Sequence, residues 1–251
     1  MIQVKNINKS FNGVSVLNDI SVTFETGKTN LIIGRSGSGK TVLLKSIVGL
    51  HDVDDGEIWF EGDLFNKLDF GERKKIRSEM GMLFQGSALF DSLTVRHNVR
   101  FPLDMFSDMS SEEKKKRVSF CLDRVNIKNS DDLFPAELSG GMKKRVAIAR
   151  AIALNPKYLF CDEPNSGLDP LTAILIDELI KELTEEYQMT TIVNTHDMNS
   201  VMEIGEKIIF IHEGSKCWEG NKNEILTSTC NTLNDFVFSN ALAKKLREDK
   251  L

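Results

Sequence analysis

The chain has 251 residues, of which 41% are hydrophobic and 27% charged, and its formal net charge is −5. These values are ordinary for a folded water-soluble protein, and the length suits one domain with or without a subdomain. The acidic balance gives no overall reason to expect nucleic-acid binding. No apolar run approaches the about 18 residues that a membrane-spanning helix needs, and the start lacks the profile of a secretory signal.

The first 60 residues predict strands on both sides of one helix. Apolar and polar residues alternate before and after Asn12–Gly13, which predicts a β-hairpin over the first 25 residues because this dipeptide favours a tight turn. An apolar run at 28–34 predicts a short buried strand, and the spacing of apolar residues at 41–50 predicts a helix. Another strand is expected at 56–62, between glycines.

Helical signals dominate from Gly86 to Glu137, where a capping box of Ser110 and Glu113 starts one helix. Strands and helices then alternate again. This order predicts an α/β fold with a mostly parallel sheet and an antiparallel β edge. The later expected elements are strands at 157–164 and 190–196, a helix at 171–183, a hairpin at 206–220 and a helical segment at 233–249.

A phosphate-binding loop is the clearest motif in the chain. Residues 34–41 read GRSGSGKT and fit the pattern G-x-x-x-x-G-K-[ST] between a predicted strand and a predicted helix. Glycines let backbone N–H groups turn toward phosphates, while Lys40 reaches the β- and γ-phosphates and the Thr41 hydroxyl ligates Mg²⁺. The predicted ATP-binding residues here are Gly34, Arg35, Ser36, Gly37, Ser38, Gly39, Lys40, Thr41 and Val42.

Two carboxylates and a histidine follow predicted strands. Asp162 ends an apolar strand and is expected to hold the Mg²⁺ shell, while Glu163 is expected to polarise a water toward the γ-phosphorus. Ligands gather at the carboxyl ends of strands in open parallel sheets, so His196 is predicted to hydrogen-bond the γ-phosphate. Taken alone, the Asp162–Glu163 pair is more often a strand end that faces water, and a histidine such as His196 is more often structural or solvent-facing.

A second stretch has the features of an anion site. Ser139, Gly140 and Gly141 precede an apolar helix that carries no acidic residue in its first turn. The N-terminus of such a helix presents unpaired N–H groups and a positive dipole end to an anion. The residues alone do not say why one chain has two such sites.

The motifs GRSGSGKT, LSGG, CDEP, SGLD and TH occur in an order that resembles the nucleotide-binding subunits of ABC transporters, over roughly residues 2–220. The resemblance implies a P-loop NTPase core with an antiparallel β subdomain and a helical subdomain. It also implies that two copies face each other head to tail. Each ATP then lies between the phosphate loop of one copy and Ser139, Gly140 and Gly141 of the other, and hydrolysis lets the copies separate.

The same resemblance implies roles for three further residues. Gln85 matches a glutamine that contacts Mg²⁺ and the attacking water, and it starts the segment that meets the transmembrane permease. Asp169 matches an aspartate through which the two ATP sites sense each other. Phe11 stands where the family places an aromatic ring against adenine; the alternative is a core residue of the hairpin.

Two stretches resemble a subfamily. Many members have Gln where this chain has Met142, and the sequence MKKR at 142–145 resembles the ATPases of Mla-type phospholipid transport systems, whose partners are MCE-domain proteins. Residues 83–103 resemble the same subfamily. The alternative subfamily is the ATPases of methionine and polar amino-acid importers. Two alternatives to a transport ATPase are an ABC ATPase that acts outside transport and a nucleotide-binding scaffold that does not hydrolyse ATP. Met142 could equally be a packing residue.

We therefore expect a single ABC ATPase domain over residues 1–251 that uses ATP and Mg²⁺. It should lie in the cytoplasm, peripherally on the cytoplasmic face of the inner membrane, without a nucleic-acid partner. A hypothesis for the segment from Leu233 onward is contact with the partner ATPase. The expected parts are a catalytic core with β subdomain at 1–85 and 141–220, a helical subdomain at 86–140 and a C-terminal extension at 221–251.

Overall fold

The computed structural model describes residues 1–238, which form two compact units. The first unit comprises 1–25, 29–67 and the chain from Asn194 onward; the second comprises 26–28 and 68–193. Strands and helices alternate in both, which confirms the α/β class. Within residues 1–238 no helix combines the length and apolarity needed to cross a membrane. The subdomain boundaries expected from the sequence stay predictions.

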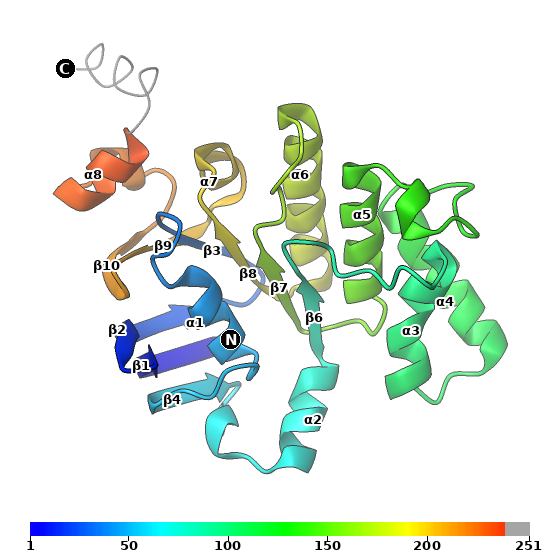
Figure 1. Cartoon of the computed structure of the whole chain (residues 1–251), viewed down its shortest axis with the longest axis horizontal. Coiled ribbons are helices and arrows are strands. Elements are labelled where there is room, and N and C mark those ends of the chain that lie inside the picture. The colour runs from blue at the N-terminus through cyan, green and yellow to red at the C-terminus, as the bar shows by residue number, and fades with distance from the viewer. Residues whose placement is uncertain (239–251) are drawn as a thin grey trace. The chain divides into compact units, whose positions relative to one another are not determined.

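The first unit contains an antiparallel four-stranded sheet in the order β2-β1-β4-β5, of which Figure 1 labels β2, β1 and β4. The predicted hairpin is confirmed, because β1 pairs antiparallel with β2 and the turn residues Asn12 and Gly13 have φ of 51° and 80°. The four strands are β1 (Ile2–Phe11), β2 (Val14–Phe24), β4 (Asp55–Phe60) and β5 (Asp63–Leu64).

A second set of strands in this unit places the phosphate loop. The buried strand β3 (Thr29–Ile33) pairs parallel with β9 (Lys207–His212), and β9 pairs antiparallel with β10 (Ser215–Gly220). The chain leaves β3 through the glycine-rich loop and enters α1, as predicted. The helices of the unit are α1 (Lys40–Ile47), α7 (Met198–Ile204) and α8 (Asn231–Val237), with 3₁₀ turns η1 (Phe65–Lys67) and η3 (Ile225–Thr227).

The helix expected at 233–249 is present in part as α8; residues 239–249 of that prediction lie outside the described residues. Its packing face, which the sequence does not indicate, includes Leu233, Phe236 and Val237, all of which are buried. The Phe236 ring lies 5.4 Å from that of Phe210 in β9. Contact of this segment with a partner ATPase stays a hypothesis.

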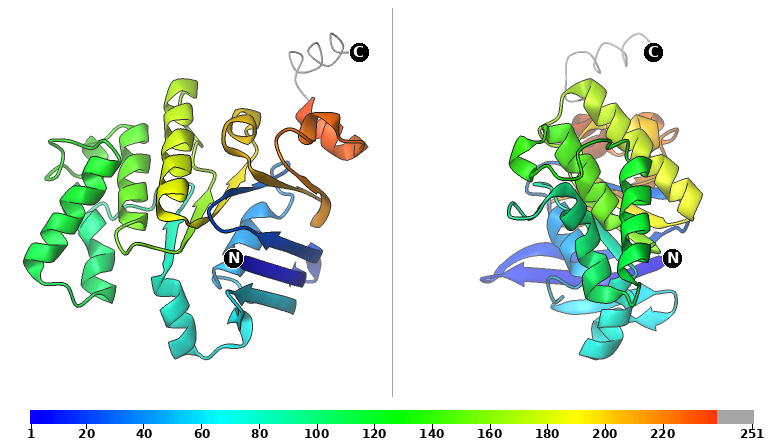
Figure 2. Two further views of the ribbon diagram at one scale, coloured as in Figure 1. Left: turned by 180° about the vertical axis from the view of Figure 1, so that it is seen from behind. Right: turned by 90° about the vertical axis from the view of Figure 1, so that its right-hand side faces the viewer.

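The second unit combines two strands and most of a third with a group of helices. β6 (Met80–Leu83) pairs parallel with β7 (Tyr158–Asp162), and β8 (Thr190–Thr195) follows β7 in the sheet order. Helices α3, α4 and α5 lie against one another, and α5 also lies beside α6 (Figure 2). The helices are α2 (Phe70–Ser78), α3 (Val95–Phe106), α4 (Ser111–Arg124), α5 (Gly140–Ala151) and α6 (Pro170–Tyr187), with the 3₁₀ turn η2 (Pro135–Glu137).

Polar residues at helix starts explain where these helices begin. The predicted capping box of α4 is confirmed, since the Glu113 N–H donates to Ser110 Oγ and the Ser110 N–H donates to Glu113 Oε2. The predicted helix at 171–183 is confirmed as part of α6, whose Leu179 and Leu183 are buried. Leu171 is 75% exposed, so the apolar spacing continues beyond the buried face.

Asn98 fixes the loop that precedes α3. Its side chain is fully buried, and its Oδ1 accepts a hydrogen bond of 2.8 Å from the Phe90 N–H. Its Nδ2 lies within 3.1 Å of the carbonyl oxygens of Phe90, Leu93 and Thr94. One amide therefore pairs with the Phe90 N–H and the Leu93 carbonyl oxygen, and it adds a donor to the carbonyl oxygens of Phe90 and Thr94, which already accept from backbone N–H groups.

We expect Asn98→Ala to lower the free energy of unfolding by about 1–3 kcal/mol, because it leaves buried backbone groups without partners. Chemical denaturation measures this change. Asn199→Ala is the matched control, since Asn199 is exposed and should shift stability by no more than about 0.5 kcal/mol. Equal stability of the Asn98 variant and the wild type would contradict this account of the loop.

Candidate active site

The predicted site residues divide between the two units, and each group has its own neighbours. Those of the first unit are Phe11, Gly34, Arg35, Ser36, Gly37, Ser38, Gly39, Lys40, Thr41, Val42 and His196. Those of the second unit are Gln85, Ser139, Gly140, Gly141, Asp162, Glu163 and Asp169.

Two glycines of the phosphate loop, Gly34 and Gly39, occupy positions where any side chain would displace a neighbour. At Gly34, whose φ is 152°, a Cβ would lie 2.3 Å from the Ile211 carbonyl oxygen. At Gly39, whose φ is 103°, a Cβ would lie 2.9 Å from the Val16 carbonyl oxygen. The loop is therefore packed tightly against β9 and β2 at its base, while its tip at residues 35–37 is exposed.

Lys40 places a positive charge inside the phosphate loop. Its side chain is only 5% exposed, and its ammonium donates hydrogen bonds of 2.9 and 3.1 Å to the carbonyl oxygens of Gly34 and Arg35. Lys40 is also the first residue of α1, which has no acidic side chain in its first turn. A tight glycine loop, a helix N-terminus and a buried ammonium together fit the phosphates of a nucleotide.

His196 follows β8 on a backbone that is held on both sides. The Asp197 N–H donates to Thr195 Oγ1 at 3.0 Å, and the Asp197 carboxylate accepts from the Asn199 N–H at 2.9 Å and caps α7. Thr195 is buried, whereas His196 itself is exposed. The imidazole therefore extends from a fixed backbone position at the end of a strand.

Phe11 lies at the surface and is not a core residue of the hairpin, because 39% of it is exposed. The ring of His51 meets its ring in a T-shaped arrangement with centroids 5.4 Å apart. The Lys9 ammonium lies 5.2 Å from the centroid of the same ring. An exposed aromatic ring with its orientation fixed by neighbours can stack on a base.

The helix start at Ser139 is confirmed. Ser139 caps α5, its Oγ accepting from the Met142 N–H at 3.2 Å, and the first turn of α5 has no acidic residue. Gly141 allows α5 to approach α6 closely, since a Cβ there would lie 2.7 Å from Thr172 Cγ2. The start of α5 is therefore open to an anion on one side and packed against α6 on the other.

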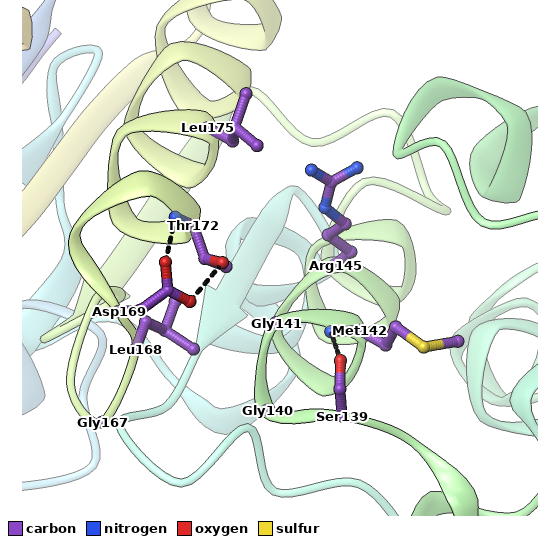
Figure 3. Close-up of a pocket in the computed structure, with 10 residues that line it drawn as sticks. All are labelled: Ser139, Gly140, Gly141, Met142, Arg145, Gly167, Leu168, Asp169, Thr172 and Leu175. Atoms are coloured by element: carbon purple, nitrogen blue, oxygen red, sulfur yellow. Dashed lines mark hydrogen bonds between the residues drawn. The ribbon is translucent and has the colours of Figure 1, made fainter.

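A cleft of about 310 Å³ lies beside the starts of α5 and α6. Figure 3 shows the residues that line it. Asp169 caps α6 by accepting from the Thr172 N–H at 3.0 Å and from its hydroxyl at 2.6 Å. The Thr172 hydroxyl, followed by that N–H, holds the pKa of Asp169 below its usual value. Asp169 therefore has a local structural role that the sequence motif does not reveal. The cleft is lined by Ser139, Gly140, Gly141, Met142, Arg145, Gly167, Leu168, Asp169, Thr172 and Leu175.

Asp162 and Glu163 stand at the end of β7 in different environments. Asp162 is the last residue of the strand and only 4% exposed, whereas Glu163 is half-buried. Glu163 has a φ of 50°, in the left-handed region that costs a non-glycine residue about 1–2 kcal/mol. Strain of this kind is common at functional positions. Its carbonyl oxygen accepts from the Ser166 N–H at 3.1 Å.

The structure connects Gln85 to the residues after β7. The Gln85 Nε2 lies 3.4 Å from Ser166 Oγ. Lys144 of α5 donates from its ammonium to the carbonyl oxygens of both Gln85 and Glu163. Burial lowers the pKa of Lys144, and the nearby Cys161, Asp162 and Glu163 act in the opposite direction.

The segment after Gln85 is also fixed by α5. Arg150 donates to the carbonyl oxygens of Ser87 at 2.9 Å and Ala88 at 2.7 Å. Both residues have left-handed backbones, with φ of 64° and 47°. The sequence does not predict the contacts of Lys144 and Arg150, because lysine and arginine in an amphipathic helix usually indicate a solvated face. Nor does it predict those of Ser166 and His51, whose partners Gln85 and Phe11 are distant in sequence.

The predicted site residues include oxygen donors suited to Mg²⁺, the ion that accompanies ATP. Mg²⁺ typically takes one or two protein oxygens together with phosphate oxygens and water. Among residues 1–238 no group of three or more histidine, cysteine or acidic side chains forms a site of its own. The Thr41 hydroxyl in the first unit and the Asp162 carboxylate in the second are each an oxygen donor of the kind that this ion takes.

Comparisons of the sequence with known proteins identify the family. The family model described as ABC transporter matches residues 17–166. A methionine import ATP-binding protein, MetN of Carboxydothermus hydrogenoformans, is 36% identical over 254 residues, which cover 100% of this chain and 75% of the relative. The intermembrane phospholipid transport system ATP-binding protein MlaF of Haemophilus influenzae is 36% identical over 228 residues, covering 91% and 86%.

The fold is also similar to that of a solved structure. The dimeric ATP-binding cassette in a post-hydrolysis state bound to ADP and Pi is 35% identical, with a TM-score of 0.82, and the match covers 88% of this chain and 99% of the cassette. ATP hydrolysis, with ATP as the nucleotide and Mg²⁺ as the usual cofactor, is the activity of this family. The chain therefore belongs to the ABC transporter family and is one of its ATPases.

Proposed function

We propose that this ATPase powers the movement of phospholipid between membranes of a bacterial envelope. ATP would be hydrolysed in a head-to-tail dimer of the chain on the cytoplasmic face of the inner membrane, beside transmembrane permease subunits. An MCE-domain protein is the proposed further partner. The family, the phosphate loop before α1 and the helix start at Ser139 support the ATPase part of this proposal.

The proposed hydrolytic roles follow from the chemistry of the side chains. Lys40 would bind the β- and γ-phosphates, the loop N–H groups would face the same oxygens, and Phe11 would stack on adenine. Glu163 would orient the attacking water and accept its proton, with Gln85 holding that water and His196 donating to the γ-phosphate. Each role needs a fixed side chain, and the held backbones of Glu163 and His196 support this.

The need for a second copy follows from the start of α5. Ser139 and Gly140 present a helix N-terminus, which suits a phosphate, in the same molecule that already has the phosphate loop. In the proposed dimer this helix start binds the γ-phosphate held by the partner copy. ATP then stabilises the dimer and its hydrolysis weakens it, because the bridging group is lost. Asp169, next to the same cleft, is the proposed link between the two sites.

The phospholipid assignment is carried by residues 83–103 and the sequence MKKR at 142–145, which resemble Mla-type ATPases. The relative named as an intermembrane phospholipid transport protein is as similar, at 36% identity, as the methionine import relative. Overall identity therefore does not separate the two substrates. A segment that meets the permease should vary with the partner, so its sequence is the better indicator.

The exposed face near Gln85 supports permease contact. Phe90 is 42% exposed and its ring lies 4.6 Å from that of Phe101, which is 37% exposed. Met105, one helical turn further along α3, is 58% exposed. Three neighbouring apolar side chains at the surface suit contact with another protein. We call Phe90, Phe101 and Met105 the α3 apolar face and propose that the permease binds there.

For hydrolysis, we expect Glu163→Gln to reduce the ATPase rate at least about 100-fold while ATP still binds, because the general base is lost and the phosphate loop is intact. Lys40→Ala should weaken ATP binding itself. Steady-state rates and nucleotide-binding titrations measure both. Glu182→Gln, an exposed glutamate of α6, should match the wild type. A Glu163→Gln enzyme with full activity would rule out the proposed role of Glu163.

For the substrate, we expect gentle purification from native membranes to yield a permease, an MCE-domain protein and bound phospholipid. Mass spectrometry of the proteins and lipid extract identifies them. Phe101→Ser should reduce the yield of permease without changing the ATPase rate of the isolated subunit. A permease accompanied by a solute-binding lipoprotein would instead indicate methionine or amino-acid import and overturn the lipid assignment.

A further inference from the structure

Lys144 is a buried cation in the second turn of α5, and only 4% of it is exposed. Its ammonium makes no ion pair with a carboxylate among the described residues. Its hydrogen-bond acceptors are two backbone carbonyl oxygens, those of Gln85 and Glu163, the latter at 3.4 Å. A buried ammonium is costly unless it is hydrogen-bonded, so these carbonyls are needed to keep the charge inside the protein.

The two acceptors come from different segments. Gln85 follows β6 and Glu163 follows β7, and these strands pair in parallel. Lys144 therefore joins three elements at one point: the helix that begins at Ser139 and the ends of two neighbouring strands. The direction of the Gln85 and Glu163 side chains depends on these backbones.

Glu163 depends most on such support. Its backbone is in the left-handed region, with a φ of 50°, which a glutamate does not favour. Its carbonyl oxygen accepts from Lys144 and from the Ser166 N–H, and Ser166 Oγ in turn lies 3.4 Å from the Gln85 side chain. Donors on both sides thus hold a strained peptide in place.

We infer that Lys144 is a positioning residue for ATP hydrolysis: its ammonium fixes the backbones of Gln85 and Glu163 relative to α5. The inference rests on the proposed roles of Gln85 and Glu163. Arg150, on the same helix, holds the carbonyl oxygens of Ser87 and Ala88, so the two cations support successive parts of one segment. Of these two cations, Lys144 is the one that reaches the residue proposed as the general base.

The test compares Lys144→Met with wild type in the full-length chain. Methionine keeps length and helix propensity but donates no hydrogen bond. We expect kcat to fall about 10- to 100-fold, because small displacements of a reacting group have effects of this size. KM for ATP and the affinity for a non-hydrolysed ATP analogue should stay unchanged. Lys144→Arg, which keeps the charge and donors, should recover part of the lost kcat.

Two further variants make the result specific. Lys143→Met removes the adjacent, half-buried lysine and should leave kcat unchanged. Lys144→Gln keeps a shorter, neutral donor and should give a kcat between those of Lys144→Met and wild type; it also serves if Lys144→Met does not fold. Thermal melting of each variant shows which ones are folded at the assay temperature.

A folded Lys144→Met or Lys144→Gln enzyme with wild-type kcat would overturn the inference. So would an equal loss in all three Lys144 variants together with a lowered melting temperature, since that indicates a structural role only. Glu163→Gln in the same assay distinguishes the positioning role of Lys144 from the proposed catalytic role of Glu163. If Glu163→Gln is inactive and Lys144→Met is normal, the positioning role fails and the proposed function stands; if Glu163→Gln is fully active, the proposed catalytic role itself fails.

Discussion

The proposed binding of a multiply charged phosphate by helix N-termini is the interaction on which the rest of this account depends. Both α1 and α5 begin without an acidic residue in the first turn, after a glycine loop in one case and at a serine cap in the other. Unpaired N–H groups and the helix dipole favour an anion at both starts. The close contacts at Gly34, Gly39 and Gly141 are what allow these helix starts to lie where they do.

Helix α5 connects this interaction to the rest of its unit. Its first turn lies beside the cleft with Asp169, its second turn carries Lys144, and Arg150 near its end holds the chain after Gln85. The α3 apolar face, which is proposed to bind the permease, begins with Phe90 just after this segment. A displacement of α5 by a bound phosphate would therefore act on the backbone of Gln85 and on the segment that follows it, because hydrogen bonds join them.

The sequence predicts the parts of the site that local chemistry determines. Glycine spacing identifies the phosphate loop, and Ser139 predicts its helix cap, because each needs only neighbouring residues. The supporting contacts of Lys144 and His51 are not predictable, since their partners are distant in sequence. Nor does the sequence indicate the left-handed backbone of Glu163, because no glycine or asparagine signals it. The apolar spacing that predicts α6 likewise does not show that Leu171 is exposed.

The central claim is that the start of α5 acts on ATP bound by a second copy, and mixing two inactive variants tests it most directly. One variant carries Lys40→Ala and the other Ser139→Arg. In a head-to-tail dimer of the two, one site combines an intact phosphate loop with an intact Ser139. If Ser139 acts on the ATP of a second copy, the mixture hydrolyses ATP faster than either variant alone. A mixture no more active than the average of the two would contradict it.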